Sequence, residues 1–371
     1  MRALKAALLA ALASCAIYDS SLLLDAGSDG DAEVPVDAEA GADVDSCKHA
    51  EPPPRPAADD PSDGGDVEFV VALRYVDFGL AADAGIFGFD LDHTCTCPAA
   101  ETCVPAAGAP QHCDDPFGRD NAGGALLKQY SQLSSSIFNT DKINANVAKG
   151  VNGMLLRVRN WNGQPNDGQV AFAVFVSTGT LPLDDAGANP IPKHDGTDQW
   201  GIDPSSMVGT PPPYNAVNED TAAYVSGGVL VANASFPFSV GQSYGTNFLR
   251  FDDALVIGTI ASTPNGYALD GVLAGRWDTR NALTGMQAAK DPFNPGEYLC
   301  GTNTTYLAIK SSICKAADIA HTIASDNAGA PCDALSTSVG YQTEPALLGA
   351  LLAPLPRNTP CGATYSDQCG N

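Results

Sequence analysis

Short runs in which apolar and polar side chains alternate are the feature that most constrains the fold of this chain. In the run 69–75 the odd-numbered residues are Phe, Val, Leu and Tyr, so they share one face, which is the period of a β-strand. Six further runs have this period: 154–159, 170–176, 224–232, 248–251, 254–260 and 268–276. Asn-Gly and Asp-Gly pairs at 162–163, 265–266 and 270–271 favour tight turns.

The number and spacing of these runs predict the fold class. Many short strands with long loops, and no repeating strand–helix–strand order, indicate a mainly β protein. We expect an antiparallel β-sandwich of jelly-roll or lectin-like type over residues 67–290, with a cysteine-rich insertion at 90–121. Helical spacing predicts helices at 125–133, 279–289 and 304–319, the last after an Asn303 cap. Residues 291–371 are therefore expected to form a small helical cap held by disulfides.

The first 15 residues have the pattern of an export signal. Arg2 and Lys5 precede a run of eight apolar residues, which is too short to span a bilayer. The stretch Leu12-Ala13-Ser14-Cys15 resembles the lipobox of bacterial lipoproteins. That resemblance implies a signal peptide over 1–14, lipidation of Cys15 and, with Ala16 rather than Asp after it, the outer membrane or cell surface. An ordinary secretory signal and a buried helix start are the alternatives.

Residues 15–66 have the composition of a tether. From Asp19 to Asp66 the chain carries 14 acidic residues and two basic ones, together with repeated Ala, Gly, Ser and Pro. Such a segment cannot bury a core, so we expect a disordered linker, or alternatively a cation-binding acidic tail. The net charge of the whole chain is -24, which argues against nucleic acid as a partner because the phosphates would be repelled.

Ten cysteines remain once Cys15 carries lipid. An even number in an exported protein predicts disulfides. The candidates are Cys47, Cys95, Cys97, Cys103, Cys113, Cys300, Cys314, Cys332, Cys361 and Cys369. The four in the insertion can pair in three ways, and Cys361 and Cys369 are close enough to close a small loop. Cys47 is then left for a C-terminal cysteine or for another chain.

Two kinds of metal site are conceivable around the insertion. His93 and His112 lie among its four thiols, but the spacing lacks the paired C-x2-C geometry of zinc sites. Calcium fits the acidic side chains on either side of the cysteines, because it prefers hard oxygen ligands on loops. The candidate ligands are Asp90, Asp92, Asp114, Asp115, Asp120 and Asn121. Neither acidic stretch matches an EF-hand, and metal-free Asp and Asn turns are the alternative.

A sugar could bind where aromatic rings stand beside amides and carboxylates. The loop after the second strand run offers Trp161, Asn162, Asn166 and Asp167, and a later loop offers Trp200. An indole face stacks on the C–H face of a sugar, while amides and carboxylates bind its hydroxyls. The competing interpretation is turn formation, with both tryptophans packed over the edge of the fold.

The chain contains no familiar catalytic motif. G-x-S-x-G, H-E-x-x-H, a Walker loop and a dinucleotide-binding turn are all missing from the sequence. We therefore expect a binding or structural module, with a glycan or an envelope protein as partner besides the membrane. The alternative function is an extracellular polysaccharide hydrolase that uses Asp carboxylates.

A wider resemblance covers most of the mature chain. The stretches Cys15–Asp19, Phe89–Cys97 and Gly118–Asn121, together with the acidic tether, look like uncharacterised cysteine-rich lipoproteins of myxobacterial type. The resemblance implies export and lipid anchoring. It brings no known activity and no catalytic or binding residue.

Overall fold

The computed structural model describes residues 48–57, 63–80, 87–97, 99–133, 138–151, 153–185, 187–239, 248–353 and 359–370. All of them belong to one compact unit. The expected signal peptide 1–14, the lipidated Cys15, Cys47 and the first part of the expected tether lie outside the described residues. In the part of the chain that is described, no helix has the length and apolar character needed to cross a bilayer.

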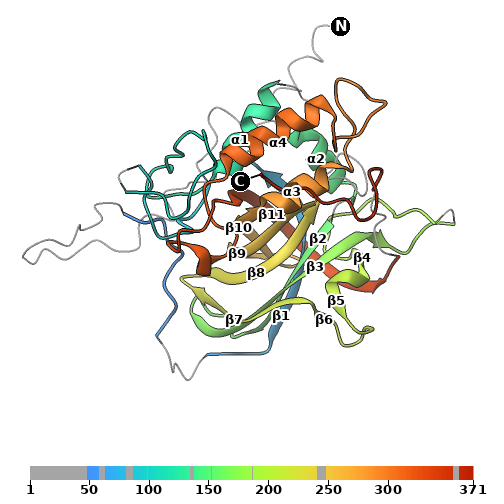
Figure 1. Ribbon diagram of the computed structural model, residues 1–371. Coiled ribbons are helices and arrows are strands. Elements are labelled where there is room, and N and C mark those ends of the chain that lie inside the picture. The colour runs from blue at the N-terminus through green and yellow to red at the C-terminus, as the bar shows by residue number, and fades with distance from the viewer. Residues whose placement is uncertain are drawn as a thin grey trace, which may run out of the picture. The chain divides into compact units, whose positions relative to one another are not determined.

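The strands close into an eight-stranded antiparallel barrel (Figure 1). β1 pairs with both β2 and β11, and β3 pairs with both β2 and β7, so the ring has no free edge at either place. In ring order the strands are β1 (Val67–Asp77), β2 (Gly153–Trp161), β3 (Asp167–Leu181), β7 (Asn218–Ser226), β8 (Val229–Ser239), β9 (Phe248–Thr263), β10 (Gly266–Asp278) and β11 (Ala334–Leu351).

The expected β-sandwich is therefore wrong, and the region expected to form a helical C-terminal cap also contributes a strand to the barrel. β11 lies within residues 291–371 and is the longest strand, with 18 residues. On one side Val70 of β1 lies opposite Ala346, and on the other Asp278 of β10 lies opposite Ala334. The alternation of side chains predicts where strands form, but it does not predict that the last strand joins the first.

Apolar side chains fill the barrel. Phe69, Val71 and Leu73 of β1 are at most 8% exposed and pack with the inward side chains of the other strands. The expected face ends there, because the pairing of β1 with β11 shifts register between Leu73 and Tyr75. Tyr75 is consequently 42% exposed, and Val76 is buried in its place.

One predicted turn lies instead in the middle of a strand. Asp270 and Gly271 belong to β10, and the turn between β9 and β10 consists of residues 264 and 265, just before Gly266. The glycine at 271 serves close packing, because a Cβ there would lie 1.8 Å from the carbonyl oxygen of Ile257. The Asp-Gly pair was therefore a misleading turn signal.

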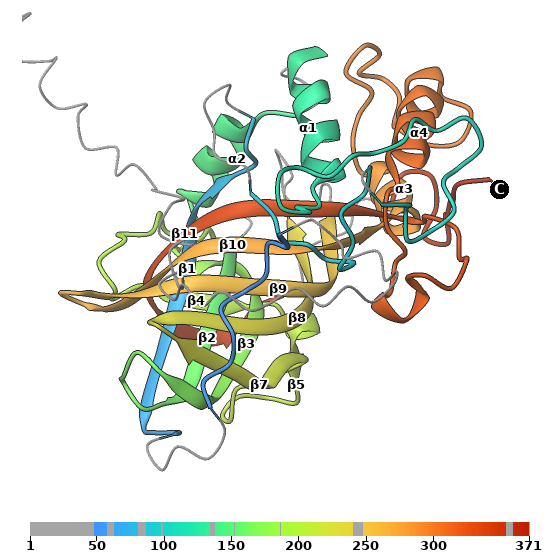
Figure 2. The same cartoon turned by 90° about the vertical axis from the view of Figure 1, so that its left-hand side faces the viewer.

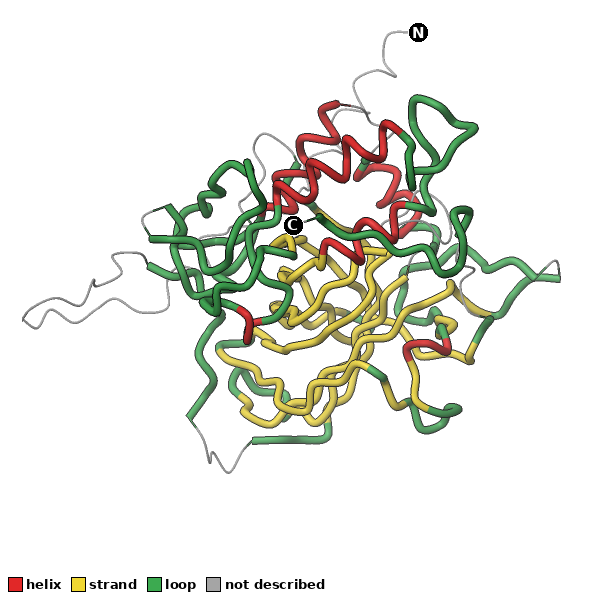
Figure 3. The backbone as a smooth tube through the Cα atoms, viewed as in Figure 1, coloured by secondary structure: helices red, strands yellow, loops and turns green. Residues whose placement is uncertain are grey.

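The α-helices of the described residues lie over one end of the barrel, as Figure 3 shows. They are α1 (Ala122–Leu133), α2 (Thr140–Val147), α3 (Thr279–Met286) and α4 (Thr304–Ala316). The helices expected near 125–133, 279–289 and 304–319 are confirmed. The Asn303 cap is also confirmed, since its side chain accepts a hydrogen bond from the Tyr306 amide at 2.8 Å. Tyr306, Ile309 and Ile313 of α4 join the main core.

The outside of the barrel carries a second apolar layer on the β1–β3 side. β4 (Gln199–Ile202) pairs antiparallel with β3 and parallel with β11. A short 3₁₀ turn (Pro204–Ser206) leads into the hairpin of β5 (Met207–Val208) and β6 (Asn215–Ala216). Phe175, Trp200 and Ile202 form the centre of this outer layer.

Residues 48–57, which we call the strap, run along the outside of the barrel (blue in Figure 2). The Tyr224 hydroxyl donates to the Pro53 carbonyl at 2.6 Å, and the Arg55 guanidinium lies 4.5 Å from the centre of the Tyr224 ring. Arg55 also donates to the carbonyls of Gly168 and Ala222. This part of the expected tether is thus in contact with the folded body.

Four disulfides join described cysteines. They are Cys97–Cys113, Cys103–Cys332, Cys300–Cys361 and Cys314–Cys369. Cys95 is also disulfide-bonded. The expected small loop between Cys361 and Cys369 is wrong, because each joins a cysteine near or within α4. Pairing confined to the insertion is wrong as well, because Cys103 reaches Cys332 across 229 residues.

Candidate cation site

The described residues of the cysteine-rich insertion fold against the barrel as loops until α1 begins. Phe89 and Leu91 anchor its first part, because both are buried against outward side chains of β8, β9 and β10. The Cys97–Cys113 disulfide closes its middle, and the Cys103–Cys332 disulfide ties it to the segment before β11. Asp90 and Asp92 are thereby held on the barrel surface.

Three carboxylates converge at this place. Asp90, Asp92 and Asp120 each contribute an oxygen to a group whose members all lie within 4.8 Å of one another. The three residues are 4%, 6% and 3% exposed. Two oxygens on opposite sides of one calcium ion are separated by about 4.8 Å, because each lies about 2.4 Å from the ion. The spacing of this group, which we call the carboxylate cluster, therefore fits a single cation.

Hydrogen bonds from backbone amides and a hydroxyl fix the carboxylates. The Thr94 amide donates to both Asp90 and Asp92, and the Thr102 hydroxyl donates to Asp92 at 2.6 Å. The Leu91 amide donates to one oxygen of Asp120 at 2.6 Å. Among the described residues nothing donates to the other oxygen of Asp120, which leaves it available to an ion.

A glycine permits the chain to pass close to the cluster. Gly118 has φ +68°, and a Cβ there would lie 2.9 Å from a carboxylate oxygen of Asp90 and 2.8 Å from the sulfur of Cys95. Any larger residue would therefore need the backbone or Asp90 to move. The turn containing Gly118 is closed by two backbone hydrogen bonds between Asp115 and Arg119.

Two further carboxylates surround the cluster. Asp114 accepts a hydrogen bond from the Thr96 amide, and Asp318 accepts from the amide and hydroxyl of Ser336. Both are near enough to the cluster to raise the pKa of Asp120 electrostatically. Negative charge is therefore concentrated here beyond the three converging residues.

Burial raises the pKa of Asp92 and Asp120 in the cluster and of the neighbouring Asp114. It raises the pKa of Asp92 from 3.8 to about 6, with a further contribution from the charge of Asp90. It likewise raises the pKa of Asp114 to about 7, with Asp92 and Asp318 adding to the effect. The pKa of Asp120 is raised well above its ordinary value by burial and by Asp92. Placing several negative charges together in a poorly solvated site has this effect, and a bound cation would relieve it.

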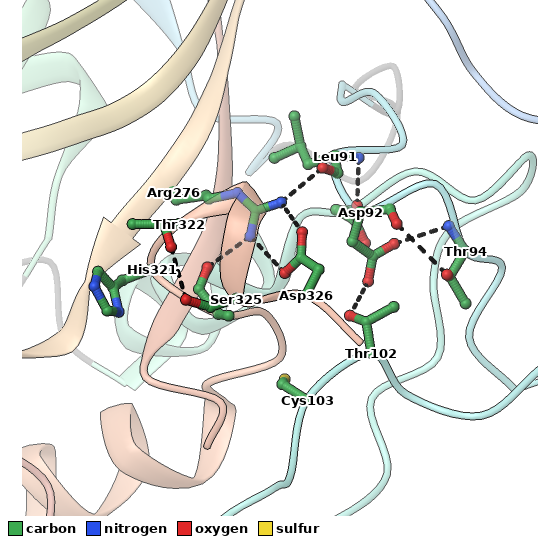
Figure 4. Close-up of polar contacts among 12 residues, drawn as sticks. Leu91, Asp92, Thr94, Thr102, Cys103, Arg276, His321, Thr322, Ser325 and Asp326 are labelled. Carbon is green, nitrogen blue, oxygen red and sulfur yellow. Dashed lines mark hydrogen bonds and ion pairs between the residues drawn. The ribbon is translucent and has the colours of Figure 1, made fainter. Parts of the chain in front are cut away.

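Arg276 and His49 lie beside the cluster, and both contact other residues. Arg276, 1% exposed, makes a two-pronged ion pair with Asp326 and donates to the carbonyls of Leu91 and Ala320 (Figure 4). At the strap, His49 Nδ1 contacts the Asp90 carboxylate, and the Asp90 amide donates to the Ala50 carbonyl at 3.0 Å. The start of the strap thus lies directly on the cluster.

The other expected calcium ligands lie elsewhere. Asp115 is exposed in the turn described above. The side chain of Asn121 accepts from the amides of Gly124 and Ser338, so it caps the start of α1. Neither residue belongs to the carboxylate cluster. His49, Arg276, Asp318 and Asp326 were missed, because nothing in their local sequence signals proximity to the insertion.

The expected sugar-binding residues do not present an open aromatic face. Trp161 is 6% exposed, packs edge-on against Phe69 and Tyr267, and donates to the Gln164 carbonyl. Trp200 is fully buried. Turn formation and packing account for both tryptophans.

The polar members of that loop bind one another. Asp167 is buried and accepts hydrogen bonds from the amides of Gly64, Asn162 and Gln169. The Asn162 side chain donates to the Asn166 carbonyl at 3.1 Å and accepts from the Gln164 amide. These hydrogen bonds build a turn and occupy the Asn162 and Asp167 side chains within it.

The cysteines of the insertion are not available as thiolate ligands for zinc. Cys95, Cys97, Cys103 and Cys113 are all in disulfides. His112 donates to the Lys315 carbonyl at 2.6 Å, and the His93 side chain is 72% exposed. The carboxylate cluster is therefore the place in the insertion with the best set of metal ligands.

Comparisons with known proteins give no relative for this arrangement. No family model, no curated protein and no solved structure matches the chain.

Proposed function

We propose that this protein is a lipid-anchored binding or structural module of the cell envelope whose cysteine-rich insertion binds calcium. The lipobox at Leu12–Cys15 supports the anchor. Disulfides support an oxidising compartment outside the cytoplasm, where calcium is also plentiful. The carboxylate cluster supports the ion.

The observation that carries the calcium proposal is the buried convergence of Asp90, Asp92 and Asp120. Three carboxylates cannot remain ionised together in so little water without a cation. Calcium prefers oxygen ligands, accepts flexible geometry and takes up waters in its remaining positions. Asp114 lies beside the cluster and offers a further carboxylate.

The ion would add stability that the insertion lacks. Its apolar contribution to the core is small, since Phe89 and Leu91 are the large buried residues of its first part. A cation held by Asp90, Asp92 and Asp120 would join two stretches that are about 30 residues apart in the chain. The ion and the disulfides would then act together on one surface of the barrel.

Hydrolysis of a polysaccharide is the weaker alternative. A glycosidase requires two carboxyl groups on either side of an open cleft that admits the sugar. The three carboxylates of the cluster are instead buried, close together and tied by backbone amides. This arrangement favours holding an ion over cleaving a glycosidic bond.

Calorimetry and thermal unfolding of the EDTA-treated, detergent-solubilised protein test the proposal. We expect calcium to bind with a Kd of about 0.1–1 mM, the range of extracellular sites. At a hundredfold excess over Kd the gain in stability is about 2.7 kcal/mol, which raises the Tm by about 5 °C. Magnesium should bind more weakly, because it demands a stricter octahedral geometry.

A pair of matched variants distinguishes calcium binding at the carboxylate cluster from non-specific attraction of calcium to the acidic chain. Asp120→Asn retains an oxygen for the Leu91 amide but loses a charge, so calcium binding should fall at least tenfold. Asp115→Asn removes the same charge from the same insertion outside the cluster and should bind calcium normally. Equal affinities in these two variants, or no calcium-dependent change in the parent protein, would refute the proposal.

The anchor has a separate test. Cys15→Ser should abolish lipid labelling and release the protein from the membrane fraction, because the acylated thiol is removed. Retained acylation in this variant would contradict the anchor without affecting the calcium proposal.

A further inference from the structure

Arg157 is a buried cation that forms no ion pair with any residue that the structure describes. It lies in β2 and is 5% exposed. Within the described part of the chain, no hydrogen bond and no ion pair reaches its guanidinium. Buried arginines are ordinarily paired, because an ion removed from water without a partner is costly.

The side chains opposite Arg157 on the outside of the barrel are apolar, so none of them can accept a hydrogen bond from its guanidinium. Val70 of β1 and Ala173 of β3 lie directly opposite Arg157 on either side. The guanidinium lies 5.3 Å from the centre of the Phe175 ring, a cation–π distance. The ring supports one face of the guanidinium but accepts no hydrogen bond from its N–H groups, so those donors remain unused.

The donors are not equally enclosed. The Nε of Arg157 is inaccessible to solvent and has no partner, whereas the two terminal nitrogens are not among the inaccessible atoms and donate to none of the described residues. This geometry suits an oxyanion arriving from solvent, which the planar fork binds through two parallel hydrogen bonds.

A second arginine raises the positive charge at this place. Arg159 follows two residues later on the same face of β2, and it makes an ion pair with Glu219. Its Nε is also buried without a partner. Burial and the neighbouring Arg159 lower the pKa of Arg157, while Glu68 and Glu219 oppose this effect from a distance. Glu68 is exposed and forms no ion pair with either arginine among the described residues.

We propose that Arg157 is the anchor of an oxyanion site on the outer face of β2, which takes a carboxylate or phosphate group of a small ligand. The two terminal nitrogens bind the oxyanion, Phe175 holds the plane of the guanidinium, and Arg159 adds attraction. This site is independent of the carboxylate cluster, because it lies on β2 and not in the insertion, and it takes a ligand of opposite charge.

Titration calorimetry of the full-length protein tests the site, with glucuronate and inorganic phosphate as probes and chloride at equal ionic strength as reference. We expect saturable binding of at least one probe, and the tighter one identifies the source of the oxyanion. Arg157→Met should weaken that binding at least tenfold. Arg250→Met is the matched control, because it removes an equal charge from an exposed ion pair with Asp252.

Folding of the variants is measured by thermal unfolding in chloride. Arg157→Met should unfold at the same temperature as the parent or higher, because an unpaired buried charge is replaced by a side chain of similar length. If it does not fold, Arg157→Gln takes its place with the same expected loss of binding. Absence of saturable binding in the parent, or undiminished binding in the Arg157 variant, would overturn the proposal.

Discussion

Arg276 and Asp326 form a two-pronged ion pair that is almost completely shielded from water, with 1% and 7% of their side chains exposed. The pair connects β10 to the loop before β11 and, through the Leu91 carbonyl, to the insertion. It therefore positions the loop next to the carboxylate cluster without being part of it.

Breaking this pair should destabilise the protein strongly. Asp326→Ala leaves Arg276 buried and unpaired, which costs about 3–5 kcal/mol. The measurement is the free energy of unfolding from urea titration, on protein with intact disulfides. The exposed pair Arg250–Asp252 supplies the control, since Asp252→Ala should cost less than about 1 kcal/mol. Similar losses in the two variants would contradict this explanation of the buried pair.

The Cys103–Cys332 disulfide should contribute more to stability than Cys97–Cys113. It joins residues 229 apart, whereas the other joins residues 16 apart, and a longer closed loop restricts the unfolded chain more. We expect the Cys103→Ser/Cys332→Ser double variant to lose about 2–5 kcal/mol. Calcium affinity should fall too, because Thr102, next to Cys103, donates to Asp92.

The comparison variant is Cys97→Ser/Cys113→Ser, which removes the same number of disulfides. Urea unfolding of both double variants in the absence of reductant gives the difference directly. If the short-loop variant proves equally or more destabilised, loop length is not the reason for the stability contributed by Cys103–Cys332.

The sequence predicts the local elements of this fold better than their assembly. Alternation identified β1, β2, β3 and β10, but it divided β9 into two runs, merged β7 and β8 into one run and missed β11, while helical spacing identified α1, α3 and α4. Closure of the barrel depends on the pairing of Val70 with Ala346, across most of the chain, and alternation carries no information about such a distant partner. For the same reason the expected sandwich was wrong.

The carboxylate cluster was likewise predictable where its residues are close in the sequence and unpredictable where the fold brings in a distant one. Asp90, Asp92 and Asp120 were expected together because a cysteine-rich segment separates them, and disulfides shorten such a distance. Asp318 could not be foreseen, since it approaches only because β11 folds back beside the insertion. The sequence left two interpretations open for Trp161, because an aromatic residue beside a turn has the same pattern whether it faces solvent or the core; the structure packs it against Phe69 and Tyr267.

The strap should detach from the barrel when the side chain of Arg55 is removed. Arg55→Ala loses the stacking on Tyr224 and two hydrogen bonds to backbone carbonyls, worth about 1–2 kcal/mol together. Hydrogen exchange of residues 48–57 should become faster. Lys48→Ala removes an equal charge from the exposed start of the strap and should leave exchange near Arg55 unchanged. Equal protection in the Arg55 variant and the parent would show that other contacts hold the strap.

The cluster gives the metal-free protein an unusual dependence of stability on pH. The folded-state pKa values of Asp92 and Asp114 are about 6 and about 7, above the ordinary 3.8 of the unfolded chain. At pH values from about 4 to about 7 these two residues therefore bind more protons in the folded chain than in the unfolded chain. Their contribution to stability is therefore greatest at low pH and is lost as the pH rises through about 6 to 7. Because solvent screens these charges in part, we expect the free energy of unfolding to fall by only on the order of 2 kcal/mol between pH 5 and pH 8.

Thermal unfolding in EDTA across this interval measures the effect. The Asp92→Asn/Asp114→Asn variant should have a flatter profile, because the two groups no longer titrate. Calcium should abolish or reverse the fall in the parent protein, since the ion binds the ionised carboxylates and competes with protons. A metal-free protein whose Tm is constant or rises from pH 5 to pH 8, with the double variant following the same curve, would show that these carboxylates are not close together in solution.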